Sequence, residues 1–207
     1  MALAFLAGWR QKGRMDALPR DIKKQLRAEA LARRDALDPQ WRIERSMAMA
    51  EAMADLDVDG DTVVSGFWPM RSEVDIRPAM FALGSMGARL CLPAILDKST
   101  IVFRELVRGA ELVDMGFGTF GPGPGARELE PDLMLVPLAA FDRRGHRIGY
   151  GAGHYDRAIA RLQEKGKARR LIGIAFECQQ VEHVPDQPHD ILLPEILTER
   201  GLTRFPR

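Results

Sequence analysis

Short apolar runs that alternate with stretches of helical spacing are the feature that most constrains this chain. Leu133–Val136 (LMLV) is apolar at every position and ends at Pro137, and Arg170–Phe176 (RLIGIAF) is nearly as apolar. A strand with no polar face is typical of a parallel sheet that helices cover on both sides. The sequence therefore predicts buried strands in the middle of an α/β domain.

Further strands and helices alternate along the chain. Strands are predicted at Thr62–Trp68, Arg89–Leu92 and Thr100–Leu106, and helices at Arg77–Met86, opened by Pro78, and at His154–Lys165. Two helices lead the chain, from Asp21 to about Ala36 and, after the N-cap Asp38, from Pro39 to about Leu56. The pattern predicts a single three-layer α/β/α Rossmann-like domain with a mostly parallel sheet and two leading N-terminal helices.

Two segments stand apart from this pattern. Gly116–Gly125 (GFGTFGPGPG) is either a linker or a surface loop, and we favour a loop inside one domain because the sheet pattern resumes directly after it. Residues 1–18 are expected to be an N-terminal extension outside the folded domain of residues 19–207. Their apolar run at Leu3–Ala7 lacks the basic start of a signal peptide, and Met15 is an alternative initiator.

Bulk properties exclude several classes of protein. The 207 residues carry a formal net charge of +1, which argues against a nucleic-acid binder that relies on an overall positive field. No apolar stretch approaches the roughly 20 residues that cross a bilayer. The two cysteines, Cys91 and Cys178, lack metal-site or redox spacing and are expected to be reduced structural thiols.

The segment from Leu133 to Arg157 (LMLVPLAAFDRRGHRIGYGAGHYDR) combines the features of a phosphate-binding loop. After the buried strand, Asp142–Gly145 predicts a tight reversal. Glycines at alternate positions from Gly149 to Gly153 let the backbone approach an anion, and the following helix adds free N–H groups at its start. Arg147 supplies a fixed cation, and Asp156 stands where a carboxylate could hold magnesium against phosphates.

Glycine spacing alone would favour a flexible turn, and this segment carries neither the Walker pattern nor GxGxxG with an acidic residue at the right distance. The wider motif, however, resembles 5-formyltetrahydrofolate cyclo-ligases, also called methenyltetrahydrofolate synthetases. LVPLAAFDRRGHRIGYGAGHYDR is similar to the family's pattern of a strand ending in VPG followed by FD..G.R.G.G.GYYDR. Further similarities lie at KKQLR with Lys23 and Arg27, at Gly66–Pro78, and at His183–Glu199, so the resemblance spans residues 20 to 204.

The resemblance implies roles for particular residues. ATP binding is implied for Lys23, Arg27, Arg147, Ile148, Gly149, Tyr150, Gly151, Ala152, Gly153, His154 and Tyr155. Folate binding is implied for Trp68, Glu73, Tyr150, Gly151, Ala152, Gly153 and His154. Arg147 would be catalytic, and Asp156 and Asp190 would be the metal ligands.

The reaction implied by the resemblance uses ATP and Mg²⁺ to convert 5-formyltetrahydrofolate to 5,10-methenyltetrahydrofolate, with release of ADP and phosphate. A formamide is a poor electrophile, so its oxygen would first take the γ-phosphoryl group and N10 would then close the ring. We expect these small molecules, rather than nucleic acid or membrane, as partners of a cytoplasmic monomer or weak homodimer.

Several positions depart from the family pattern and keep other hypotheses open. His154 replaces a tyrosine, Ala152 a lysine, Leu138 a glycine and Pro194 an aspartate. A relative that binds folate or nucleotide without turnover is the second hypothesis, and a phosphate-ligand enzyme such as a sugar-phosphate isomerase is the third. Taken alone, Lys23 and Arg27 would indicate a solvated basic helix face, and Trp68 would fit the core equally well.

Overall fold

The computed structural model describes residues 19–116 and 118–206, so the predicted extension at residues 1–18 lies outside the described residues. Among the described helices, none is long and apolar enough to span a membrane. Cys91 and Cys178 are both free thiols, as predicted.

Two helices lead the described chain, as predicted: α2 (Pro19–Asp35) and α3 (Pro39–Ala54). The carboxylate of Asp38 accepts a hydrogen bond from the backbone N–H of Trp41 (2.9 Å), and Pro39 follows at the first helical position. The N-cap and the proline therefore start α3, and only three residues separate it from the end of α2. The observed ends differ from the predicted ones by one or two residues, as helix ends commonly do.

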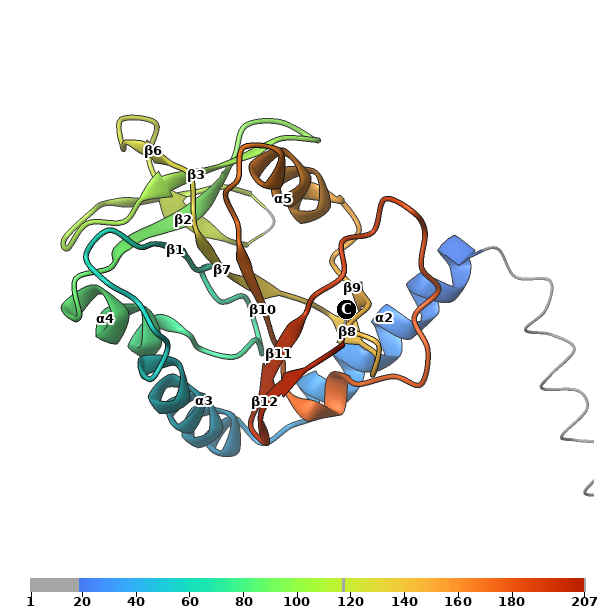
Figure 1. Cartoon of the computed structure of the whole chain (residues 1–207). Helices are drawn as coiled ribbons and strands as arrows, with labels where there is room; N and C mark the ends of the chain where they lie inside the picture. Colours follow the sequence, from blue (N-terminus) through green and yellow to red (C-terminus); the bar gives the residue numbers. More distant parts are fainter. Residues whose placement is uncertain (1–18, 117, 207) are drawn as a thin grey trace, which may run out of the picture.

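A sheet of eight strands forms the centre of the molecule, in the order β12-β11-β10-β7-β1-β2-β3-β6 (Figure 1). Its strands are β1 (Val63–Ser65), β2 (Arg89–Ile95), β3 (Ile101–Glu105), β6 (Glu128–Leu129), β7 (Leu133–Pro137), β10 (Arg170–Ile174), β11 (Glu195–Thr198) and β12 (Gly201–Arg204). The five neighbours from β11 to β2 pair in parallel, whereas β12, β3 and β6 join antiparallel at the edges. The mostly parallel sheet is confirmed, and its antiparallel edges were not predicted.

Alternate residues of the central strands face two separate cores. Leu133 and Leu135 of β7 pack in the core that α3 and α4 (Arg77–Ser85) cover, whereas Met134 and Val136 pack in the core under α5 (His154–Glu164). Helices therefore lie on both faces of the sheet, which explains why β7 is apolar at every position. The α/β class is confirmed.

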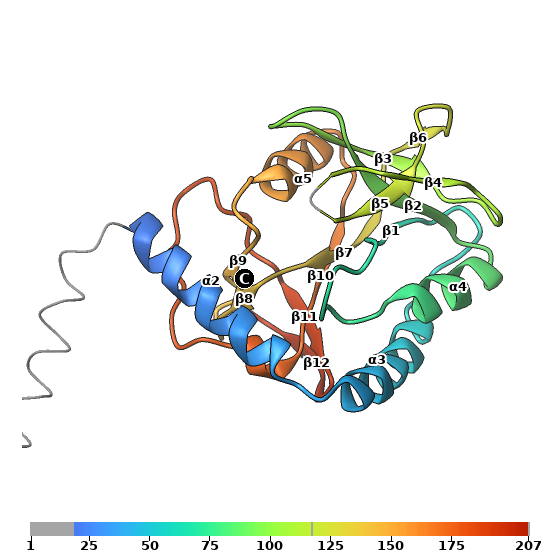
Figure 2. The same ribbon diagram turned by 180° about the vertical axis from the view of Figure 1, so that it is seen from behind.

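Helix α2 contributes its buried side chains to neither of these two cores. Leu26 and Ala30 of α2 form a third, small core with Ala140, Ile148 and Val184, around a hairpin of β8 (Ala140–Phe141) and β9 (Arg147–Ile148). Both views place α2 beside this hairpin, away from α4 (Figure 1; Figure 2). The Rossmann-like description of the layers therefore stays a prediction.

The predicted tight reversal between these strands is confirmed. The Gly145 N–H donates to the carbonyl of Asp142 (3.1 Å), and Gly145 has φ of 82°. A Cβ at this position would lie 2.3 Å from the Leu193 carbonyl oxygen, so only glycine fits. The fully buried Asp142 carboxylate accepts from the N–H groups of Arg144 and Val184, which ties the turn to a distant segment.

The glycine- and proline-rich segment is part of a second hairpin rather than a linker. β4 (Leu112–Asp114) pairs antiparallel with β5 (Phe120–Pro122), and β5 packs against β2 and β3 (Figure 2). A Cβ on Gly121 would lie 2.9 Å from the Pro93 carbonyl oxygen, which shows how closely the hairpin lies on the sheet. The predicted surface loop is wrong for Phe120–Pro122, which form strand β5, and the single domain stays a prediction.

Candidate functional site

The predicted site residues gather at the carboxyl ends of the parallel strands. β1 lies between β2, the next strand along the chain, and β7, which follows later. The strand order therefore reverses at β1. In open α/β sheets such a reversal of strand order is where ligands bind. The segments after β1, β7 and β10 converge there on a narrow hollow that leaves no space for a water molecule. It is lined by Arg34, Phe67, Glu73, Val74, Pro137, Leu138, Ile174 and Gln179.

Glu73 is the central polar group of this hollow. Its side chain is 4% exposed, and its Oε2 accepts from the Met70 N–H (2.8 Å), while Oε1 accepts from the Tyr150 hydroxyl. Burial raises the pKa of Glu73, and the contacts with Tyr150, Met70 and Arg34 oppose that rise only in part. Two of the residues predicted to bind folate, Glu73 and Tyr150, are therefore in direct contact.

Arg34 is the residue that the sequence analysis missed. Its side chain is 2% exposed, its Nη1 donates to the Tyr150 hydroxyl (2.8 Å) and lies 3.9 Å from Glu73 Oε1. The spacing of residues in α2 could have indicated that Arg34 is buried, because Leu26, Ala30 and Arg34 are spaced four apart and all three are buried. A charge within the apolar stripe of a helix requires buried partners, which marks it as different from its exposed basic neighbours.

The glycine loop lies between β9 and α5, next to α2. Gly151 and Gly153 have φ of 105° and 66°, a region that side chains disfavour, and α5 has no side-chain cap at Gly153. Arg27 Nε donates to the Gly149 carbonyl (2.7 Å), and its guanidinium lies 3.5 Å from the position of a Cβ on Gly151. Arg27 is thus half-buried against the loop, and the solvated face weighed above is wrong for it.

Two ion pairs join the other predicted residues. Arg147 Nη2 lies 2.8 Å from Asp156 Oδ1, and Lys23 Nζ lies 2.6 Å from Asp190 Oδ2. Arg147 also donates to the carbonyl of Ile191, whose N–H donates to Asp156 Oδ1 (3.1 Å). Burial lowers the pKa of Arg147, while Asp156 and Asp190 counteract that change. The structure therefore brings α2, β9, the start of α5 and the segment before β11 together.

The two aspartates fit a magnesium ion bound largely by phosphate and water. In the described part of the chain, one oxygen of each carboxylate is engaged, Oδ1 of Asp156 and Oδ2 of Asp190, whereas the other oxygen has no hydrogen bond. Those residues include no cluster of three or more His, Cys, Asp or Glu side chains that would form a closed metal cage. Magnesium often takes only one or two protein carboxylates beside substrate phosphates, so the donor set is suitable.

The remaining predicted residues are less closely engaged. Ile148 is buried in the small core under α2, and Ala152 is exposed, with its carbonyl accepting from Arg157 (2.7 Å). His154 Nε2 and the Tyr155 hydroxyl are buried without a hydrogen-bond partner among the described residues. Both lie in the first turn of α5, directly after the glycine loop.

Trp68 lies at the edge of the site. It is half-buried against the core under α3 and α4, and the Arg77 guanidinium lies 5.4 Å from its ring centre. The ring does not line the hollow around Glu73. The core interpretation of Trp68 is therefore at least partly right.

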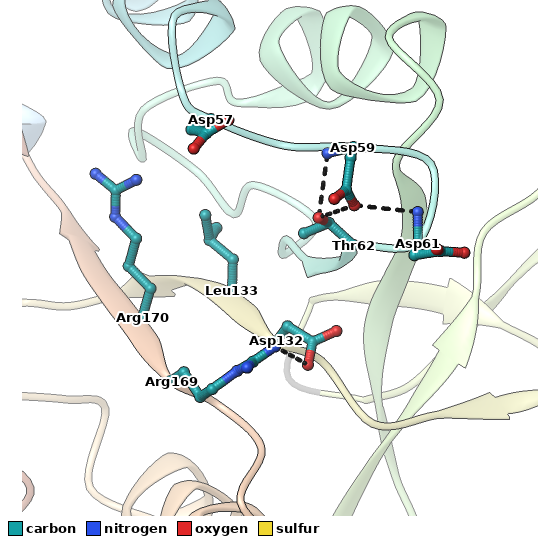
Figure 3. A pocket seen from close by; sticks show the side chains of 8 residues that line it. All are labelled: Asp57, Asp59, Asp61, Thr62, Asp132, Leu133, Arg169 and Arg170. Carbon is teal, nitrogen blue, oxygen red and sulfur yellow. Dashed lines mark hydrogen bonds and ion pairs between the residues drawn. The ribbon is translucent and has the colours of Figure 1, made fainter.

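A larger hollow of about 300 Å³ lies at the opposite ends of the strands (Figure 3). Its side chains are Asp57, Asp59, Asp61, Thr62, Asp132, Leu133, Arg169 and Arg170. Some of these polar groups pair with one another, since Asp59 accepts from Thr62 and Asp132 pairs with Arg169. None of the predicted residues lies there, so the smaller hollow at the carboxyl ends remains the candidate site.

Comparison with known proteins gives one consistent result. The model of the 5-formyltetrahydrofolate cyclo-ligase family matches residues 19–199. The 5-formyltetrahydrofolate cyclo-ligase of Mycolicibacterium smegmatis is 30% identical over 87% of this chain and 95% of its own length, and that of Escherichia coli K12 is 31% identical over 80% and 94%. Among solved structures, the NMR structure of Aquifex aeolicus 5,10-methenyltetrahydrofolate synthetase has a TM-score of 0.74 at 25% identity and covers 90% of this chain and 94% of its own.

The family match covers the leading helix, the glycine loop and the segment that carries Asp190, which are the parts that build the site. The chain therefore belongs to the 5-formyltetrahydrofolate cyclo-ligase family.

Proposed function

We propose that this protein converts 5-formyltetrahydrofolate to 5,10-methenyltetrahydrofolate, using ATP and Mg²⁺ and releasing ADP and phosphate. The observation that carries the proposal is the assembly of three cations and two carboxylates around one glycine loop, beside a buried glutamate. The cations are Lys23, Arg27 and Arg147, and the carboxylates are Asp156 and Asp190.

The phosphates of ATP would lie on the loop from Gly149 to Gly153. The start of α5 offers backbone N–H groups without a side-chain cap, and Arg27 lies against the loop from the other side. Arg147 is held by the Ile191 carbonyl and by Asp156, so its guanidinium is already oriented when a phosphate arrives. Asp156 and Asp190 would hold Mg²⁺, which would neutralise phosphate charge.

The pterin ring of the folate would use the hollow at Glu73. An ionised carboxylate accepts hydrogen bonds from the amino and ring N–H groups along the donor edge of a pterin. In the protein without ligand, the Tyr150 hydroxyl donates to Oε1 of Glu73. A pterin that bonds to this oxygen must therefore displace Tyr150, a residue that is 41% exposed.

The reaction then proceeds in two steps. The formyl oxygen attacks the γ-phosphorus, its O–P bond forms, and the bond to the bridging oxygen breaks with release of ADP. N10 next attacks the activated carbon and loses its proton, and the C–O bond breaks as inorganic phosphate leaves. Arg147 and Lys23 stabilise the negative charge that develops on the phosphoryl oxygens in the first step.

The direct test is to mix the purified protein with 5-formyltetrahydrofolate, ATP and Mg²⁺ and to follow the near-ultraviolet band of the methenyl product. We expect product only when ATP is present, in equal amount to the ADP formed, and loss of turnover on chelation of Mg²⁺. Absence of product at high enzyme concentration would refute the proposal.

A second candidate function is folate or nucleotide binding without turnover. The observation in its favour is the buried Nε2 of His154, which has no hydrogen-bond partner among the described residues and stands where the family pattern noted above has tyrosine or another aromatic. Calorimetry that shows tight binding of 5-formyltetrahydrofolate without ATP hydrolysis would select this alternative. A cytoplasmic location and a monomeric or weakly dimeric state belong to the same proposal, and light scattering of the purified protein checks the latter.

A further inference from the structure

Arg34 is a buried charge whose partners all belong to the neighbourhood of Glu73. It lies in the last turn of α2, where a cation is favoured by the helix dipole, but its exposed neighbour Arg33 would serve that purpose equally well. Removing a guanidinium from water is costly unless it is paired and hydrogen-bonded. The contacts that compensate this cost therefore indicate what the residue does.

Arg34 donates to two hydroxyl groups. Nε donates to Ser72 Oγ (2.9 Å), and Nη1 donates to the Tyr150 hydroxyl (2.8 Å). A hydroxyl has one proton to donate, and an arginine cannot accept it. The Ser72 proton is consequently directed to Asp35, and the Tyr150 proton to Glu73, which is the arrangement observed.

The Arg34 guanidinium thus bonds to two residues that hold Glu73 in place, Ser72 and Tyr150. Ser72 precedes Glu73 in the chain, so its bond to Arg34 fixes the backbone from which Glu73 projects. Tyr150 fixes Oε1 of Glu73 from the opposite side, and the charge of Arg34 lies 3.9 Å from the same oxygen.

We propose that Arg34 is a positioning residue for folate binding, which holds Glu73 in the orientation and ionised form that the donor edge of the pterin requires. The inference rests on the proposed function, because it assigns Glu73 to the pterin. When the substrate displaces Tyr150, the bond from Arg34 to Ser72 and the positive charge near Oε1 of Glu73 remain. Arg34 does not touch the reacting atoms.

The electrostatic surroundings of Glu73 support this role. The titratable and charged groups that face it are Arg34 from α2, Tyr150 from the glycine loop, Tyr155 from α5 and, across Ser72, Asp35. Only Arg34 carries a positive charge among these. Since burial already raises the pKa of Glu73, removing Arg34 raises that pKa further. A protonated Glu73 would present a donor to the donor edge of the pterin, and binding would weaken.

The test compares Arg34→Gln with the matched control Arg33→Gln, which alters an exposed arginine one position away that donates to the carbonyls of Cys178 and Gln180. We expect Arg34→Gln to raise KM for 5-formyltetrahydrofolate about tenfold or more, since about one pKa unit of lost interaction corresponds to a factor of ten. KM for ATP should stay within about twofold of wild type. The acid limb of kcat/KM for the folate should move to higher pH, which a merely structural defect would not cause.

Arg34→Lys provides a second variant if Arg34→Gln does not fold. Lysine keeps the charge but cannot bond both hydroxyls from one rigid plane. We expect its acid limb to stay near that of wild type while KM for the folate rises severalfold. An unchanged KM for the folate in either folded variant, or equal effects in Arg33→Gln, would overturn the inference.

A measurement on the free protein separates this inference from the proposed function. Carbon-13 NMR of the Glu73 carboxyl group follows its titration without substrate, and Arg34→Gln should shift the midpoint upward. If wild-type protein shows no turnover but this shift occurs and folate binding weakens, the proposed function fails and the role of Arg34 stands. If turnover is present and the titration of Glu73 is unchanged, the role of Arg34 is refuted.

Discussion

Lys23 and Asp190 form an ion pair in which Nζ lies 2.6 Å from Oδ2, although 167 positions separate them in the chain. Each side chain is 18% exposed, so the pair is neither fully buried nor fully solvated. Bound ATP with Mg²⁺ would give both groups better partners: phosphate for the lysine, and the metal for the aspartate. The ion pair would therefore hold both side chains in place until the proposed ligand supplies each with a new partner.

Replacing Lys23 with methionine should impair ATP binding selectively. The aliphatic part of the side chain is kept, but the cation offered to phosphate is lost. We expect KM for ATP to rise about tenfold to a hundredfold, the range of one charge-assisted hydrogen bond of about 1.5–3 kcal/mol. Steady-state kinetics at saturating folate measures it, with the exposed neighbour Lys24→Met as control. Equal KM values for the two variants would contradict the assignment.

Asp156→Asn should impair turnover far more than folding. The asparagine oxygen can still accept from Arg147 and from the Ile191 N–H, so the bonds that hold the loop–helix junction are kept. The negative charge proposed to bind Mg²⁺ is lost, and we expect kcat/KM to fall about a hundredfold and the half-saturating Mg²⁺ concentration to rise. The cost in unfolding free energy should be about 1 kcal/mol. Full activity with unchanged Mg²⁺ dependence would rule out the metal assignment.

Gly151→Ala should strain the loop without changing the core. Gly151 has φ of 105°, and its Cβ would meet the Arg27 guanidinium at 3.5 Å. We expect a loss of about 1–3 kcal/mol in unfolding free energy from backbone strain, together with a higher KM for ATP. Gly149→Ala is the matched control for stability, since a Cβ there has open space and an ordinary φ. Urea unfolding of the two variants tests the difference, and equal stabilities would contradict it.

Asp142 should make stability depend on pH in the acid range. Burial alone would raise its pKa, but hydrogen bonds from the Val184 N–H and from Arg144 hold the pKa below its ordinary value. A depressed pKa means that the stabilisation is fully present above the unfolded-state pKa near 3.9 and is lost as pH falls through the folded-state pKa.

Asp142→Asn should therefore lower the unfolding free energy by about 2–3 kcal/mol at pH 7, and by less below about pH 4. Urea unfolding at a series of pH values gives both quantities. A difference between variant and wild type that stays constant from pH 7 to pH 3 would show that the carboxylate charge does not contribute.

The sequence predicted the elements that bury large apolar surface. The runs at β7 and β10 and the helix α5 are long enough, or apolar enough, for their periodicity to decide the structure. The short hairpin strands β4, β5, β8 and β9 have two or three residues each, and such lengths carry no periodicity. These strands form only because of the segments against which they pack, and such tertiary contacts cannot be read from the local sequence.

The site was predictable where a local motif carried it. Arg147, the glycine loop and Asp156 occur in one continuous segment, so spacing and resemblance identified them together. Arg34 was not predicted as a site residue because its proposed role depends on contacts with Ser72 and Tyr150, which lie 38 and 116 positions away in the chain. Trp68 was ambiguous for a related reason, since a strand end does not reveal which of two neighbouring cores its side chain will join.

The small core of Leu26, Ala30, Ala140, Ile148 and Val184 gives α2 and the β8–β9 hairpin a hydrophobic contact of their own, separate from the two cores of the sheet. Lys23, Arg27 and Arg147 are all carried by these elements, whereas Glu73 follows a strand of the sheet. The residues proposed to bind ATP and the glutamate proposed to bind the pterin thus belong to two parts with separate cores, and Arg34 and Tyr150 bridge them. We expect a substrate that parts Tyr150 from Glu73 to loosen the coupling between these parts, while the bond from Arg34 to Ser72 remains, so that occupancy of one ligand's site would influence the other.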